Sequence, residues 1–176
     1  MKKIVIINGM GFGREVASWI TDMPGFGSEF TIRGFLDDRP EASRIPGLPV
    51  VGSPDNYHLA EDEQLVIALS DPCRKAELAH RYTESGTSFF SVIHPSSVIS
   101  VHSEIGKGCI IAPFNSISSD VMVGDFVCIY GFCRIGHDVR IGNYCHIASH
   151  CSLGGCIVIP DGSILKDFTH IPKQTI

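Results

Sequence analysis

An aliphatic residue recurs at every sixth position through the second half of the chain. A helix repeats every 3.6 residues and an alternating strand every two, so neither accounts for a strict period of six. A coil with three flat sides of six residues each does, and it predicts an all-β parallel β-helix of just over four eighteen-residue coils over residues 93–176. The series runs without a gap through Ile93, Ile99, Ile105, Ile111, Ile117, Val123, Ile129, Ile135, Ile141, Ile147, Leu153, Ile159, Leu165 and Ile171.

Small or β-branched side chains dominate two positions before each aliphatic residue, and we expect them to point into the coil as well. Four cysteines share this position, which predicts that they are small buried hydrophobes: Cys109, Cys133, Cys145 and Cys151. A glycine often follows the aliphatic residue, where we expect it to relieve backbone strain near the corners: Gly106, Gly124, Gly136, Gly142 and Gly154.

The first half of the chain follows a different pattern, with strands and helices in alternation. β-Branched runs predict buried strands over residues 4–7, 30–36 and 65–69. Apolar residues at helical spacing predict a helix over 16–23. Asp71 before Pro72 is typical of a helix start and predicts a second helix through about Tyr82. Residues 1–92 therefore form an α/β Rossmann-like domain in this interpretation.

A glycine-rich segment, Asn8 to Gly13, connects the first strand to the first helix. Its spacing departs from the dinucleotide-binding fingerprint, yet glycines at a helix N-terminus still allow a phosphate to approach the backbone. Spacing alone favours a phosphate loop and a plain tight turn equally. Asp37 and Asp38 follow the second strand, where an acidic residue could meet a sugar hydroxyl or belong to a solvated loop.

Composition excludes several classes of protein. The chain has 176 residues, a net charge of -5 and 44% hydrophobic residues, which gives no electrostatic reason to expect nucleic acid. The N-terminal apolar run is too short for a signal peptide, and no stretch is long enough for a membrane span. Seven cysteines without a C-x-x-C pair make a disulfide framework or structural zinc site improbable. We therefore expect a cytoplasmic protein with reduced thiols and no bound metal.

The order of these parts narrows the comparison to one family. The segments are residues 7–15 (INGMGFGRE), residues 34–38 (GFLDD) and hexads carrying Ile135-Gly136-His137-Asp138. Together they resemble the hexapeptide-repeat nucleotide-sugar acetyltransferases, which include the bacillosamine-pathway N-acetyltransferase and the sialic acid O-acetyltransferase proteins. The resemblance runs from Lys2 to about Gly155. It implies a left-handed coil, acetyl-CoA as co-substrate, a nucleotide-sugar substrate and a homotrimer.

The resemblance also implies roles for individual residues. The histidine matching His137 is the general base that takes a proton from the sugar amine or hydroxyl, and Asp138 supports its basicity. Because neighbours on a strand point to opposite faces, their contact requires a corner at this place. His146 matches a histidine beside the thioester and Gly155 a glycine that lines the pantetheine. The nucleotide-sugar pocket is matched by Gly11, Phe12, Gly13, Asp37, Asp38 and Gly52.

Departures from the family keep other functions open. Asn8 stands where the family often has glycine, and Phe12 where it often has histidine. The family has further coils after the position of Leu165, so we expect a shortened β-helix and an incomplete coenzyme A groove. A carbonic-anhydrase-like metalloenzyme is one alternative, with His137, His146 and His150 as zinc ligands. On spacing alone, turn or interface positions are favoured for His146 and His150. A sugar-nucleotide-binding scaffold without activity is the third alternative.

Overall fold

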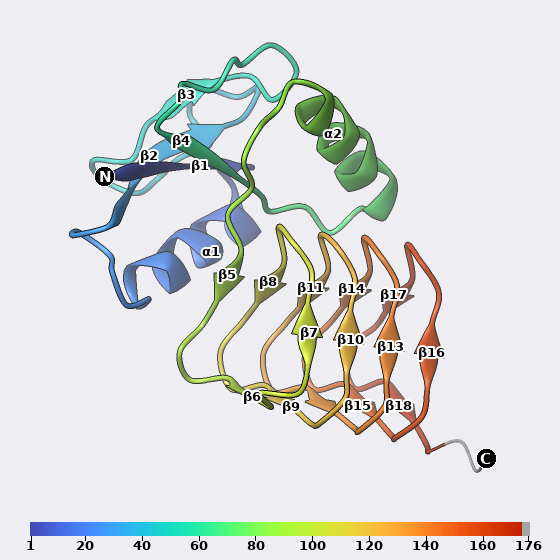
Figure 1. The fold of residues 1–176 in the computed structure, drawn as a ribbon. Helices are drawn as coiled ribbons and strands as arrows, with labels where there is room; N and C mark the ends of the chain where they lie inside the picture. The colour runs from blue at the N-terminus through green and yellow to red at the C-terminus, as the bar shows by residue number, and fades with distance from the viewer. Residues whose placement is uncertain (174–176) are drawn as a thin grey trace.

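A computed structural model describes residues 1–173 of the chain in two parts, an α/β layer and a three-sided prism beneath it (Figure 1). Within these residues, no helix has the length and apolar character needed to cross a membrane. The last three residues of the predicted segment 93–176 lie outside the described range.

The α/β layer is a four-stranded parallel sheet in the order β3-β2-β1-β4. Its strands are β1 (Lys2–Ile7), β2 (Phe30–Leu36), β3 (Val50–Gly52) and β4 (Glu63–Ile67). The first two predicted strands are confirmed. The third begins and ends two residues earlier than predicted because its pairing with β1 runs from Glu63 to Ile67. Strand β3 was not predicted, since three half-buried residues at a sheet edge carry little periodicity.

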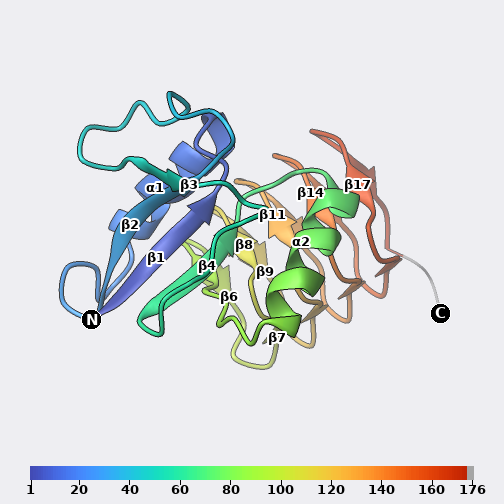
Figure 2. The ribbon, with the colours of Figure 1, turned by 90° about the horizontal axis from the view of Figure 1, so that it is seen from above.

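Two helices cover opposite faces of this sheet (Figure 2). Helix α1 (Gly11–Thr21) buries Val16 and Ile20 against the side chains of alternate β1 residues, and α2 (Pro72–Glu84) packs on the other face. The Asp71 carboxylate accepts hydrogen bonds from the Cys73 and Arg74 amides. The N-cap predicted for the second helix is therefore confirmed.

The second part is a parallel β-helix whose strands pair with those eighteen residues away, as the hexads predict. Each strand is two residues long and ends on the aliphatic residue of its hexad. Three sheets form its sides, in the orders β17-β14-β11-β8-β5, β18-β15-β12-β9-β6 and β16-β13-β10-β7. This arrangement fits a left-handed β-helix. The strands are β5 (Val92–Ile93), β6 (Val98–Ile99), β7 (Glu104–Ile105), β8 (Ile110–Ile111), β9 (Ser116–Ile117), β10 (Met122–Val123), β11 (Cys128–Ile129), β12 (Arg134–Ile135), β13 (Arg140–Ile141), β14 (His146–Ile147), β15 (Ser152–Leu153), β16 (Val158–Ile159), β17 (Ile164–Leu165) and β18 (His170–Ile171).

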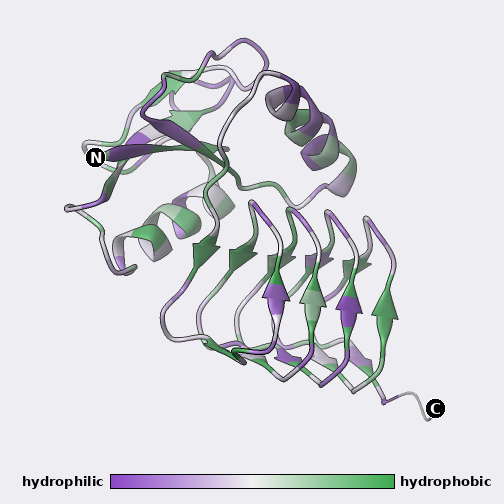
Figure 3. Cartoon of the chain, viewed as in Figure 1, coloured by the Kyte–Doolittle hydropathy of each residue, from purple (hydrophilic) through white to green (hydrophobic). Residues whose placement is uncertain are grey.

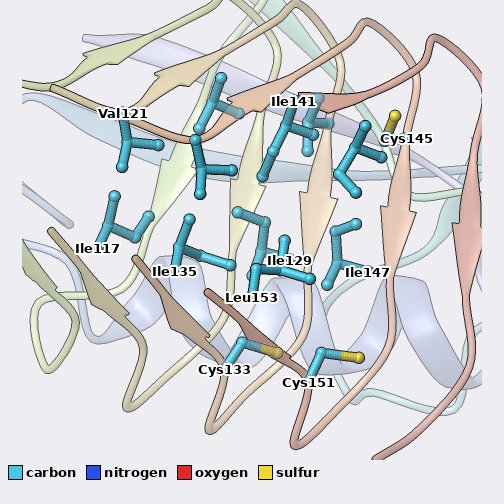
Figure 4. Close-up of a cluster of buried hydrophobic side chains, with 14 of the residues drawn as sticks. Ile117, Val121, Ile129, Cys133, Ile135, Ile141, Cys145, Ile147, Cys151 and Leu153 are labelled. Atoms are coloured by element: carbon cyan, nitrogen blue, oxygen red, sulfur yellow. The ribbon is translucent and has the colours of Figure 1, made fainter. Parts of the chain in front are cut away.

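The interior of the prism is filled by the two inward positions of each hexad (Figure 4). Aliphatic side chains such as Ile129 and Ile147 are fully buried, and all four cysteines predicted to point inward are buried too. The Cys109 thiol lies 3.1 Å from the carbonyl oxygen of Gly124 on the following turn. These cysteines act as small core residues, as predicted.

The glycines after the aliphatic residues do not relieve backbone strain at the corners, contrary to the prediction. Left-handed backbone occurs three residues after the aliphatic position, at residues such as Asp120 and Asp138, whereas Gly136 has no such φ. A Cβ on Gly136 would come within 2.7 Å of the Gly154 carbonyl carbon on the next coil. Glycine is needed there because successive coils approach closely, not because the backbone is strained.

One side of the prism packs against the α/β layer, and we call it the covered face. It consists of β5, β8, β11, β14 and β17, whose outward residues Val92, Ile110 and Cys128 are buried. We call a second side, made of β7, β10, β13 and β16, the open face. Hydropathy separates the two faces only in part: β5 and β8 have apolar colour, while on the open face β7 and β13 are polar but β10 and β16 are apolar (Figure 3).

Candidate active site

The strongest candidate for chemistry is an imidazole–carboxylate pair at the edge between β12 and β13. His137 Nδ1 lies 2.6 Å from a carboxylate oxygen of Asp138, and the two side chains are 49% and 58% exposed. Asp138 has a left-handed φ of 59°, which turns its side chain back toward its neighbour. The corner required for contact between these adjacent residues is therefore present.

Backbone hydrogen bonds to both neighbouring coils hold this edge in place. The Asp138 amide donates to the Ser119 carbonyl at 3.2 Å, and the His137 carbonyl accepts from the Cys156 amide at 2.9 Å. The imidazole is thus carried by a rigid corner rather than by a mobile loop. Its solvent-facing position leaves a nitrogen available to an incoming substrate.

Gly155 lies directly beside the His137 ring. A Cβ at this position would come within 2.7 Å of Nε2 and 2.8 Å of Cε1. Glycine therefore makes room for the imidazole, a role that spacing did not suggest. The predicted contact of Gly155 with pantetheine stays a prediction.

Two hollows lie along the open face, and Asp138 lines the smaller of them. One, of about 450 Å³, runs along the outward residues of β7, β10, β13 and β16. A smaller one, of about 240 Å³, is lined by Asp138 together with Glu104, Asp120 and Arg140. The pair therefore reaches the smaller hollow through Asp138, while His137 lines neither of these two hollows.

His146 lies on the covered face, away from His137. Its ring is 9% exposed and packs edge-on against Tyr130, with centroids 5.2 Å apart. Burial, reinforced by the charge of Lys75 on α2, lowers the pKa of His146 to about 4. Within residues 1–173, neither His146 Nδ1 nor Lys75 Nζ has a hydrogen-bond partner.

The three histidines of the metalloenzyme alternative occupy different places on one prism. His150 lies at the edge after β14, stacked between Phe132 and Phe168. His146 is nine residues, or half a coil, from His137. Since half a turn separates them around the axis, His137 and His146 can share a site only if two copies of the chain meet.

The glycine segment of the α/β layer forms a tight strand-to-helix turn. A Cβ on Gly13 would collide with the carbonyl oxygen of Asn8, so close packing requires glycine there. Asn8 has a φ of 87° and its side chain bonds to Ala68 and Met10. Met10 at the N-cap supplies no side-chain hydrogen bond to α1 among the described residues. Amides of the first helical turn are therefore available to an anion.

The two predicted acidic residues differ in how they are held. Asp37 is buried and accepts hydrogen bonds from the Gly9 amide and the Arg39 guanidinium. Burial by itself would raise the pKa of Asp37, but these hydrogen bonds outweigh it and the pKa lies below its ordinary value. Asp38 is exposed and accepts from the Ser53 hydroxyl. Asp38 is the freer of the two for a ligand.

Phe12 and Gly52 are both in contact with other side chains. The Phe12 ring stacks on Tyr130 of the prism with centroids 4.8 Å apart. A Cβ on Gly52 would come within 2.7 Å of the Tyr57 ring. Phe12 thus connects the glycine turn to the covered face, while Gly11 at the helix start is exposed.

Two family profiles match separate parts of the chain. Residues 3–82 match the PglD N-terminal domain, and residues 120–155 match the bacterial transferase hexapeptide repeat. Together the matches cover more than half of the chain. The chain belongs to the hexapeptide-repeat transferases with a PglD-type N-terminal domain. A search of curated protein sequences found no match.

Solved structures of similar fold support this placement. WeeI from Acinetobacter baumannii AYE is 24% identical, with a TM-score of 0.85 over 99% of this chain and 82% of that one. A mutant perosamine N-acetyltransferase from Caulobacter crescentus, in complex with CoA and GDP-perosamine, is 22% identical, with a TM-score of 0.76 over 97% and 91%. The acetyltransferase domain of PglB from Neisseria gonorrhoeae FA1090 is 21% identical, with a TM-score of 0.62 over 96% and 93%. At these identities the likeness concerns the fold.

Two residues of this transferase near the candidate sites were missed by sequence reasoning. Cys156 lies beside the His137–Asp138 pair, and its place at a hexad corner, outside the inward register, was a usable signal. Lys75 is 1% exposed although it lies within a polar helix. No local pattern distinguishes it from the exposed lysines.

Proposed function

We propose that this transferase moves an acetyl group from acetyl-CoA to an amino or hydroxyl group of a nucleotide-linked sugar. The His137–Asp138 pair carries the proposal, because it is an oriented imidazole at an exposed corner whose carboxylate partner lines a hollow. Structural neighbours that are acetyltransferases, one of them in complex with CoA and GDP-perosamine, support the reaction class and both substrates.

His137 acts as the general base in this proposal. Asp138 accepts a hydrogen bond from Nδ1 and thereby directs the lone pair of Nε2 toward the substrate. As the sugar nitrogen or oxygen attacks the thioester carbon, Nε2 takes its proton. The tetrahedral intermediate then breaks its carbon–sulfur bond, and the coenzyme leaves as a thiolate that the imidazolium can protonate.

The sugar nucleotide is assigned to the α/β layer, residues 1–92. The order β3-β2-β1-β4 with a helix on each face supports a Rossmann-like domain. Its phosphates would lie at the start of α1, near Gly11 and Gly13, and its sugar hydroxyls near Asp38. Phe12, Asp37 and Gly52 would support the wall of this pocket without binding the ligand directly, because each already packs against or bonds another residue of the chain.

The prism, residues 93–176, is assigned to acyl transfer, and the proposal includes a homotrimer in which the exposed His137 edge lies between neighbouring prisms. The predicted place of His146 beside the thioester would require the covered face to open, because this residue is buried between the two layers, half a coil from His137. Gly155 would belong to the interface between prisms, next to His137.

The decisive experiment is a thiol-release assay with acetyl-CoA across a panel of nucleotide amino-sugars. We expect His137→Ala to lower turnover by about 100- to 10,000-fold. His150→Ala is the matched control, because it removes an imidazole from a different edge of the same prism. Turnover unchanged by His137→Ala, with the melting temperature also unchanged, would refute the assignment.

A further inference from the structure

Cys156 is the one thiol placed beside the imidazole–carboxylate pair. One donor atom from each of His137, Asp138 and Cys156 lies within 4.8 Å of the others. These are nitrogen, oxygen and sulfur donors from two successive coils. None of the functions assigned above uses the sulfur.

The backbone holds the three donors in register. Asp138 and Cys156 are eighteen residues apart and share the same left-handed turn, with φ values of 59° and 63°. The Cys156 amide donates to the His137 carbonyl, and the absence of a side chain on Gly155 lets the ring lie close to this coil. The cluster is therefore built by the corner geometry rather than by a chance meeting of surface side chains.

This donor set matches the preference of zinc. Zn²⁺ binds imidazole, thiolate and carboxylate in tetrahedral geometry, in which donor atoms lie roughly 3.5 Å apart. The three side chains are exposed or half-buried, so small rotations can bring their atoms to that separation. Mg²⁺ and Ca²⁺ prefer sites made of oxygen alone.

The other cysteines are poorly suited to compete. Burial raises the pKa of Cys109, Cys128 and Cys133 to about 12, so these groups stay protonated near neutral pH. Cys73 is exposed but lies on α2, in the α/β layer.

We propose that His137, Asp138 and Cys156 form a zinc site that blocks acetyl transfer when it is occupied. A metal ion on the imidazole removes the lone pair that would accept the substrate proton, and solvent completes the coordination. Metal binding stands on the cluster alone, whereas the loss of activity rests on the proposed function.

Cobalt titration of the full chain tests the site directly. Co²⁺ takes the same ligands, and a thiolate ligand produces a charge-transfer band. We expect one Co²⁺ per chain with this band, displaced by Zn²⁺. Cys156→Ser should lose the band and weaken binding at least ten-fold, and the matched control Cys73→Ser should keep both. A band that persists in Cys156→Ser, or no stoichiometric binding by a folded protein, overturns the site.

The inhibition is tested separately by adding Zn²⁺ to the thiol-release assay. We expect turnover to fall and to recover with a chelator, with an inhibition constant at least ten-fold higher in Cys156→Ser. Zinc that binds without lowering turnover overturns the inhibition and leaves acetyl transfer standing. If no substrate of the panel reacts, the proposed function fails, while the cobalt titration still decides the metal site.

Discussion

The covered face and the open face of the prism follow the same hexad rule but have opposite environments. Inward residues of both faces are buried to a similar degree, as Ile129 and Ile141 illustrate. Outward residues differ. Ile110 on the covered face is 2% exposed, while Met122 on the open face is 41% exposed. The two faces therefore differ in the exposure of their outward residues and not in the way their inward residues pack.

Polar groups sharpen this contrast. On the open face, Glu104 and Arg140 border water and a groove. Between the covered face and the α/β layer, His146 and Lys75 are buried, and no described group bonds Lys75 Nζ or His146 Nδ1. The covered face thus combines strong apolar packing with two costly polar groups, and its stability should respond far more to mutation.

The largest expected effect is a cavity in the covered face. Ile110→Ala should cost about 2–5 kcal/mol of unfolding free energy, because it removes a fully buried side chain between the two layers. Met122→Ala, the outward counterpart on the open face, should change it by no more than about 0.5 kcal/mol. Equilibrium urea denaturation measures both, and equal losses would contradict the contrast between faces.

Acid should destabilise the covered face through His146. Its pKa is about 4 in the folded chain, mainly because of burial, against an ordinary 6.5. Between these values the unfolded chain binds the proton and the folded chain does not, so stability falls as the pH drops from about 6.5 to about 4. At about 1.4 kcal/mol per pH unit, the loss is on the order of 3 kcal/mol. His146→Gln should flatten this part of the stability curve.

The control for this pH effect is His102→Gln, because His102 is exposed to water at an edge of the open side. Its unfolding free energy should keep the acid dependence of the unmodified chain. An unaltered pH dependence in His146→Gln would show that another group is responsible.

A smaller gain is expected from removing the buried amine. Lys75→Met keeps a long side chain and should stabilise the fold by about 1–3 kcal/mol. Burial lowers the pKa of Lys75 below its ordinary value of 10.5. Between the two values the amine is protonated in the unfolded chain and neutral in the folded chain, so the stability of the fold rises with pH toward about 10.5. The methionine variant should lose this slope.

Lys166→Met, at an exposed position, provides the comparison and should change stability by about 0.5 kcal/mol at most. Thermal melts between pH 7 and pH 10 measure both variants. A destabilised Lys75→Met protein would mean that the amine bonds a group or water between the layers.

Much of the architecture was predictable from local pattern. Each two-residue strand from β5 to β18 ends on the aliphatic residue of its hexad, and α2 begins after the Asp71 cap. The pair His137–Asp138 was predicted from the family resemblance, and the corner that its contact requires is present. Strand β3 and the burial of Lys75 were missed because both depend on neighbours distant in the sequence.

The sequence by itself determined the period of the coil and the residues that fill it, because six-residue sides repeat the same local environment. The sequence left a phosphate loop and a tight turn equally favoured at Gly13, and the structure shows close packing against the Asn8 carbonyl there. Only the tertiary structure decided which face is covered, that His146 is buried opposite the His137 edge, and that Cys156 joins the pair. These outcomes depend on how one coil stacks on the next and on how a separate layer docks, and no local pattern encodes those distances.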